Sequence, residues 1–282
     1  MSTATGDLTG AAAPRGRGPG RARRAAGDLL APAIVFVVVV VGWELAIGSL
    51  GIKSFILPRP SEIVTALQEN WNVGFGVWPS ARATLIEAVG GFIIGTVAGV
   101  VVAFASTRWL SARNALLPLA VAAGAIPIIA FAPLMNNWFG VLSPLSKMMM
   151  AAVLVFFPVM ANVTRGLTQV EPSALELMRS YAAPESTIML KLRVPNALPY
   201  FFTALKLATT LALIGAIVGE YFGGASLVLG RIIVQSASSL KFDVTWSAIL
   251  VAAIAGIVFY LIVAGVERLV IPWHASVRGE VS

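Results

Sequence analysis

The sequence predicts an all-α integral membrane protein with six transmembrane helices and both termini in the cytoplasm. Of its 282 residues, 58% are hydrophobic and 12% are charged, with a mean hydropathy of +0.87. Soluble domains carry about 25% charged residues, so this chain has too few polar side chains to solvate a globule of its size. Apolar runs of about 20 residues, the length that crosses a bilayer, recur along the chain. A soluble enzyme and a nucleic-acid-binding chain are therefore not expected.

Five apolar runs give clear boundaries for membrane spans. They lie at Leu29 to about Ile52, Thr84–Thr107, Ser146–Asn162, Leu198–Glu220 and Val244–Val266. Between Arg113 and Lys147 the chain has no charged residue, and this stretch is too long for one span and too short for two. We expect it to hold the third span, followed by an exit loop around Asn136–Asn137 and Gly140–Pro144.

The distribution of Lys and Arg sets the expected orientation, because cytoplasmic loops are enriched in these residues. With the N-terminus inside, the inner segments carry most of the Lys and Arg residues. Residues 1–27, rich in Gly, Ala and Arg, are expected to be a disordered basic cytoplasmic tail. Residues 28–272 form the transmembrane domain, with an external loop at 53–79 and a cytoplasmic loop at 165–197. Residues 273–282 are the C-terminal cytoplasmic tail.

The cytoplasmic loop 165–197 interrupts the apolar pattern with an abrupt rise in charge. Pro172 suits the first turn of a short helix, a turn is expected at Ala182–Ala183, and a second helix should end at Pro195. Two short helices joined by a tight turn make a compact knob. Exposed apolar residues on such a knob indicate a protein partner, and an amphipathic loop at the lipid interface is the equally open alternative.

The segment ELMRSYAAPESTIMLKLRVP resembles the cytoplasmic signature of binding-protein-dependent ABC importer permeases. That signature reads Glu-Ala-Ala, three residues, Gly, nine residues, then Ile-x-Leu-Pro. Its positions are taken here by Glu176, Leu177, Met178, Ala182, Leu192, Val194 and Pro195. Ala182 stands where the signature has glycine. If the turn needs a positive φ there, alanine costs roughly 1 kcal/mol relative to glycine; otherwise the turn is built differently.

Four further segments resemble the nitrate/sulfonate/taurine-type group of these permeases: FILPRPSEIVTAL, IPIIAFAPLMNNWFGV, VFFPVMANVTRGL and VGEYFGG. The likeness covers about residues 30–272 and implies a type I ABC importer fold in a bacterial plasma membrane. It implies as partners a dimer of ABC ATPase subunits, a second permease copy or a paralogue, and an external solute-binding protein. Asn136–Asn137 before Trp138 is similar to members for pyrimidine-type vitamin precursors or flavins. The solute is therefore expected to be such a compound or a sulfonate- or nitrate-type anion.

The resemblance implies that residues 171–195 are the loop that couples the permease to its ATPase. The implied coupling residues are Glu176 and Arg179 for polar contacts, and Leu177, Met178 and Leu192 for contact area. The chain has no G-x-x-x-x-G-K-[ST] motif, so ATP and Mg are expected to bind the partner ATPase. With no cysteine and a single histidine, neither a metal site nor a catalytic residue is expected.

Polar residues inside the spans are candidates for a solute pathway, because buried polar groups in a membrane usually face a cavity or a partner. The candidates are Glu220, Asn136, Asn137, Thr209 and Thr210. Hydrogen bonds between or within helices are an equally open explanation for the Asn and Thr residues. Glu87 is expected to reach water at the outer end of its span, and Lys206 to extend toward the cytoplasmic interface.

Two rival functions stay open. An ion-coupled secondary transporter would need repeated spans and a charged ion site near mid-membrane, and the sequence has no clear repeat. A membrane-embedded enzyme would need a zinc motif, a catalytic triad or paired carboxylates at helical spacing, and no such pattern occurs. Glycines four residues apart in the second and fifth spans are expected to serve close helix packing. They are Gly91, Gly95, Gly99, Gly215, Gly219 and Gly223.

Overall fold

The computed structural model describes residues 20–73, 76–108, 118, 126–225 and 227–272, and every regular element in these ranges is helical. The chain divides into two units, Met1–Gly51 and Ile52–Ser282. The first unit contains α1 (Gly20–Leu50). From Leu30 onward this helix is apolar around its circumference apart from Glu44, as expected for a helix surrounded by lipid.

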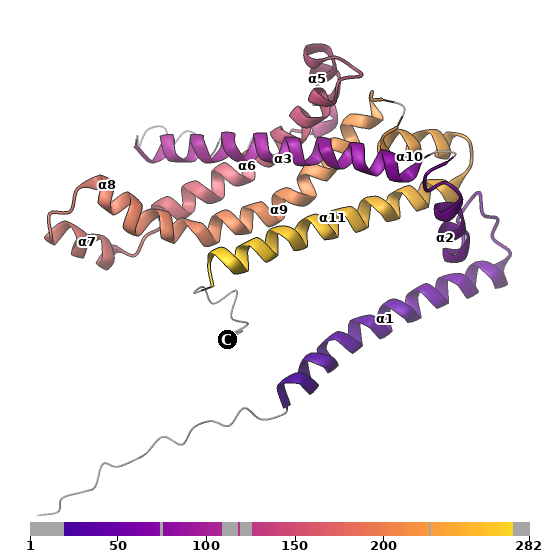
Figure 1. The fold of residues 1–282 in the computed structure, drawn as a ribbon, viewed down its shortest axis with the longest axis horizontal. Coiled ribbons are helices and arrows are strands. Elements are labelled where there is room, and N and C mark those ends of the chain that lie inside the picture. Colours follow the sequence, from indigo (N-terminus) through magenta and orange to yellow (C-terminus); the bar gives the residue numbers. More distant parts are fainter. Residues whose placement is uncertain (1–19, 74–75, 109–117, 119–125, 226, 273–282) are drawn as a thin grey trace, which may run out of the picture. The chain divides into compact units, whose positions relative to one another are not determined.

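Four long helices form the body of the second unit. They are α3 (Val77–Arg108), α6 (Pro144–Thr168), α9 (Val194–Tyr221) and α11 (Phe242–Val270). α6 packs along both α3 and α9, and α11 packs against α9 (Figure 1). Small side chains let these helices approach closely: a Cβ atom added at Gly95 would lie 2.5 Å from the carbonyl oxygen of Ala152. The packing role predicted for the glycines of α3 is thereby confirmed.

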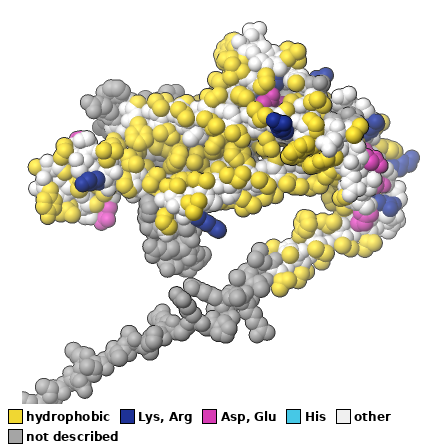
Figure 2. Space-filling view, viewed as in Figure 1, with side chains coloured by type: hydrophobic (Ala, Val, Ile, Leu, Met, Phe, Trp, Pro, Cys, Tyr) yellow, Lys and Arg dark blue, Asp and Glu magenta, His cyan; other side chains and the backbone are white. Residues whose placement is uncertain are grey.

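Five of the described helices are long and apolar enough to cross a membrane, and they coincide with the first, second, fourth, fifth and sixth predicted spans. Hydrophobic side chains cover most of the visible face of the second unit (Figure 2). The predicted third span, which begins after Arg113, lies mostly outside the described residues. The total of six spans therefore stays a prediction.

The exit loop after the third span differs from the prediction. Asn136 and Asn137 lie in a short helix, α5 (Ala132–Phe139), which follows η1 (Ile128–Phe131). Proline at the start of α5 favours helix there. The chain reverses only at Gly140, whose φ of 92° ends the helix. The loop is therefore confined to the residues between Gly140 and the start of α6.

The loop 165–197, which was predicted to be cytoplasmic, contains the two predicted short helices, but its second helix does not end at Pro195. α7 (Pro172–Ser180) is followed by a turn, α8 (Glu185–Ile188) and a wider helical turn, η2 (Met189–Arg193), that runs directly into α9. Val194 donates its N–H to the carbonyl of Met189, five residues back. Proline interrupts a helix because it lacks an N–H and crowds the preceding turn. The wider turn lies just ahead of Pro195, which then falls in the first turn of α9, where a missing N–H costs little.

The opposite end of α9 is closed by two short helices, α2 (Pro60–Glu69) and α10 (Leu229–Ser238). α2 packs against α11, and α10 packs against α9, α11 and α3 (Figure 1). Leu229 and Ile232 of α10 are fully buried there with Ala66 of α2. α10 was not predicted, because its ten residues are too few to register as a span. The second unit thus has a knob of two short helices at one end of α9 and a helical cover at the other.

Candidate functional site

The knob formed by residues 171–195 exposes apolar side chains. Leu177 and Tyr181, four residues apart and therefore on one face of the helix, are 58% and 78% exposed, and Leu190 is 69% exposed. Glu176 and Arg179 are also exposed. Leucine and tyrosine side chains this exposed indicate a surface that is covered by another molecule, a protein partner or lipid.

The remaining signature residues lie on the inner side of the knob or at its base. Met178, Leu192 and Val194 are half-buried, whereas Pro195 is exposed. The structure thus separates the residues that were expected to supply contact area: Leu177 faces outward, and Met178 and Leu192 help to pack the knob.

The turn of the knob holds Ala182 with a positive φ of 51°. Ala183 donates its N–H to the carbonyl of Met178 at 3.1 Å, and Ala182 donates to Arg179 at 2.8 Å. This pair of bonds is the Schellman arrangement that ends helices, with Ala182 at the position where glycine is favoured. Of the two explanations for the missing glycine, the structure therefore supports a strained turn over a differently built one.

We expect Ala182→Gly to stabilise this turn by about 0.5–1 kcal/mol. The left-handed conformation costs alanine about 1–2 kcal/mol, and the greater freedom of glycine in the unfolded chain offsets part of that gain. Amide hydrogen exchange at residue 183 should slow about two- to fivefold. Ala183→Gly is the matched control, because Ala183 has no positive φ, and it should speed exchange. Faster exchange in Ala182→Gly would contradict the strain.

Three ionisable side chains meet at the other end of the bundle. Glu87 of α3, Lys147 of α6 and Glu220 of α9 are 4%, 0% and 0% exposed, and their charges interact. Glu220 Oε2 accepts the N–H of Gly230 at 2.6 Å. Contrary to expectation, Glu87 does not reach water. Its span extends further toward the N-terminus than predicted, so Glu87 lies within the helix and faces α6 and α9.

The residues expected along a solute pathway do not form one group. Asn136 belongs to the buried cluster, because its Oδ1 accepts from Lys147 Nζ at 3.4 Å and its Nδ2 donates to the carbonyl of Phe222 at 3.2 Å. Thr209 is buried and donates to the carbonyl of Lys206. Asn137 and Thr210 are exposed. Asn136 is half-buried, so Asn136, Asn137 and Thr210 have accessible surface in this conformation, whereas Glu220 and Thr209 do not.

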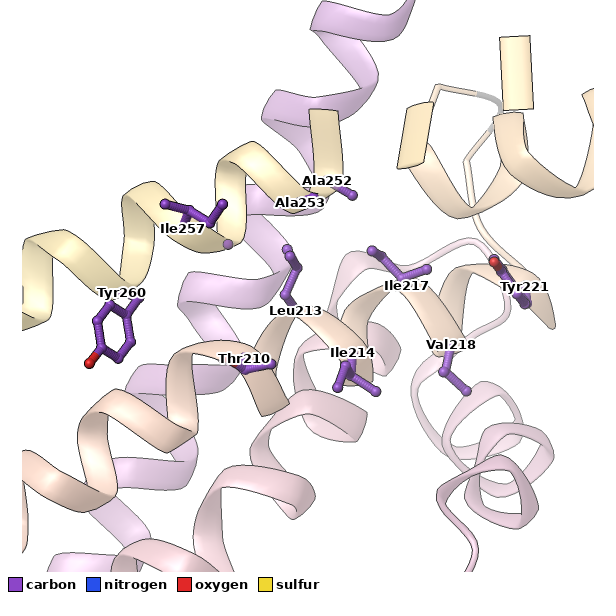
Figure 3. A pocket seen from close by; sticks show the side chains of 11 residues that line it. Thr210, Leu213, Ile214, Ile217, Val218, Tyr221, Ala252, Ala253, Ile257 and Tyr260 are labelled. Carbon is purple, nitrogen blue, oxygen red and sulfur yellow. The ribbon is translucent and has the colours of Figure 1, made fainter. Parts of the chain in front are cut away.

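Thr210 lines an apolar groove of about 500 Å³ between α9 and α11. Figure 3 shows the side chains that line it, with Tyr221 and Tyr260 toward its two ends. The hydroxyls of Thr210, Tyr221 and Tyr260 are its polar groups among the described lining residues. Such a surface accommodates a flat, largely apolar molecule or another helix.

Residues 91–274 match the family described as the binding-protein-dependent transport system inner membrane component. The chain belongs to this family. A probable ABC transporter permease protein of Haemophilus influenzae is 30% identical over 82% of this chain and 93% of its own length. The formylaminopyrimidine transport permease protein ThiX of Halalkalibacterium halodurans is 30% identical over 87% and 96%. The riboflavin transport system permease protein RibX of Chloroflexus aurantiacus is 28% identical over 86% and 90%.

Permeases named for aliphatic sulfonate, taurine and nitrate transport also match, so the predicted membership of the nitrate/sulfonate/taurine group is confirmed. The permease is a transport subunit rather than an enzyme, and a multi-pass protein of the bacterial plasma membrane. Its described residues contain no cluster of three or more His, Asp or Glu side chains suited to a metal ion.

Sequence reasoning missed one ion pair of the permease. Lys206 is paired with Glu267: its Nζ lies 2.7 Å from Oε2 and 3.0 Å from Oε1 of that residue. The pair joins α9 to α11, and the side chain of Glu267 is only 8% exposed. The available signal was Lys206, a charge inside the predicted fifth span, because intramembrane charges tend to pair; Glu267 lies one residue beyond the predicted sixth span. Lys147 and Glu87 carried the same signal.

Proposed function

We propose that this permease is the membrane subunit of an ATP-driven importer and that residues 171–195 couple it to a separate ATPase. A solute-binding protein delivers a small solute from outside, and a second permease copy or a paralogue completes the pathway. ATP and Mg are bound by the ATPase. All six predicted spans, the cytoplasmic termini and the domain boundaries at residues 27 and 272 are part of this proposal.

The exposed apolar face of the knob carries the proposal. Leu177 and Tyr181 project from a short helix that is closed by backbone hydrogen bonds and continues into α9 without a break. A force applied to such a knob moves a transmembrane helix directly. The knob also lies at the end of α9 opposite to Glu220, which supports a cytoplasmic knob and an external buried cluster in an alternating arrangement of spans.

An ion-coupled mechanism is less well supported. Two acidic side chains of the described spans, Glu220 and Glu267, are buried and hydrogen-bonded within the protein. Neither is left open to a water-filled pathway where an ion would exchange.

The groove beside Thr210 favours an uncharged heterocycle, such as a pyrimidine-type vitamin precursor, over a sulfonate or nitrate anion. Its described lining residues carry no charge, whereas an anion would require a basic partner or several N–H donors. Relatives named for formylaminopyrimidine and riboflavin transport are 30% and 28% identical to this chain, compared with 28% for an aliphatic sulfonate permease of Bacillus subtilis and 24% for the taurine permease of Escherichia coli, so the groove and not the identity carries this choice.

Purification of the permease from its native membrane tests the importer assignment. We expect a nucleotide-binding subunit to co-purify and to hydrolyse ATP faster when the solute-loaded binding protein is added. A permease that purifies without any ATP-hydrolysing partner, in a detergent that preserves other ABC complexes, would refute the proposal.

Mass spectrometry of the ligand held by the co-purified binding protein tests the solute. A pyrimidine-type or related heterocycle is the expected result. A sulfonate or nitrate would overturn the solute class and leave the importer assignment intact.

A further inference from the structure

The buried cluster of Glu87, Lys147 and Glu220 has unequal numbers of opposite charges. Two carboxylates and one ammonium, each at most 4% exposed, would leave one net negative charge in the interior. Burying an uncompensated charge is strongly unfavourable, because no partner offsets the loss of hydration. The cluster therefore requires one more positive charge, and within the described residues no second lysine or arginine interacts with it.

The hydrogen bonds of the cluster show which carboxyl oxygens lack a donor. Glu220 Oε2 accepts from Gly230, and Lys147 Nζ donates to Asn136 and to the carbonyl of Val141. Glu220 Oε1 and Glu87 Oε2 are buried and have no hydrogen-bond partner. The Thr84 hydroxyl, which accepts the N–H of Leu229, also interacts with Glu220, and a proton on one of the two carboxyls supplies the donor that Glu87 and Glu220 otherwise lack between them.

We propose that Glu87 and Glu220 share one proton, with Glu87 Oε2 as the donor and Glu220 Oε1 as the acceptor. Glu220 is the carboxylate because it already accepts a short backbone N–H bond, which favours the charged form of a carboxyl group. Lys147 balances that charge, so the cluster is neutral as a whole. Nothing in this inference depends on the coupling role of the knob.

The neutral cluster holds neighbouring helices together at the external end of the bundle. It links α3 to α9 through the shared proton and α6 through the charge of Lys147, and Glu220 adds α10 through the N–H of Gly230. The fit is tight at that point, because a Cβ atom added at Gly230 would lie 2.7 Å from Cβ of Glu220. Separating α3 from α9 would break the shared-proton bond and leave a carboxyl and a carboxylate without partners.

Four variants of the full-length permease in an ester-free maltoside detergent test the shared proton. Glu87→Gln retains a donor and should melt within about 2 °C of the wild type. Lys147→Met and Glu220→Gln each leave one charge unpaired and should melt about 10 °C lower. The double variant Lys147→Met with Glu220→Gln removes both charges and should recover most of that loss. If the single variants fail to fold, a folded double variant still shows that Lys147 and Glu220 carry opposite charges that balance each other.

Infrared spectroscopy provides the direct readout. The wild type should show a protonated-carboxyl C=O band at neutral pH that shifts in D₂O and is absent from Glu87→Gln. Absence of the band from the wild type would overturn the proposal. So would a higher melting temperature in Glu87→Gln, because relief of net charge would mean that both glutamates are ionised. A band that disappears in Glu220→Gln while Glu87→Gln retains it would place the proton on the wrong residue.

Discussion

Leu177→Asp should abolish solute-stimulated ATP hydrolysis and transport while leaving the permease folded. Leu177 is 58% exposed on α7, so a charge there costs the isolated subunit little. If the residue inserts into the ATPase, the charge loses its hydration in an apolar contact. Losses at central interface residues are about 2 kcal/mol or more, which weakens association at least about thirtyfold.

The measurement is ATPase co-purification together with ATP hydrolysis in proteoliposomes that contain the binding protein. Leu177→Met is the matched control, because it keeps an apolar side chain of similar size, and it should retain near-normal activity. An unchanged melting temperature shows that the variant is folded. If the Leu177→Asp variant retained full solute-stimulated ATP hydrolysis, the knob would not be part of the interface with the ATPase.

Gly95→Leu should prevent the permease from folding. A Cβ atom at this position would lie 2.5 Å from the carbonyl oxygen of Ala152 and 2.8 Å from Cβ of Val155. α3 and α6 must then separate along their whole contact, at a cost of about 3 kcal/mol or more. Without a strong hydrophobic force between helices in lipid, close backbone contact of this kind supplies much of the association.

Gly265→Leu provides the comparison, because the same change in α11 meets nothing within 4 Å. It should be neutral or stabilise the helix by up to about 1 kcal/mol. Monodisperse yield and melting temperature in detergent distinguish the two variants. Wild-type yield and stability of Gly95→Leu would mean that α3 and α6 are not packed as described.

Apolar runs and turn residues predicted the helices of this permease because each depends on local sequence. Pro172 begins α7 and Gly140 ends α5, and both effects act within a few residues. The predicted end at Pro195 was wrong for the same local reason. Proline usually stops a helix, but a wider turn just ahead of it places Pro195 in the first turn of α9.

The partners of the charged side chains were beyond local reasoning. Lys206 and Glu267 are 61 residues apart, and the ion pair forms only because α9 packs against α11. Thr209 and Thr210 are neighbours in sequence, yet one is buried and the other lines the groove. A rotation of about 100° per residue separates them on the helix, and only the packing decides which of the two faces outward.

Composition and segment order alone determined that this chain is a membrane protein and that most of its residues belong to membrane-spanning helices. They also determined that a charged loop of two short helices interrupts the spans. Those properties follow from solvation of each segment by itself. Tertiary structure decided that Glu87 and Glu220 turn inward toward Lys147 and that Ala182 adopts a positive φ. Burial and backbone strain are set by neighbouring helices and by turn closure, which no single segment specifies.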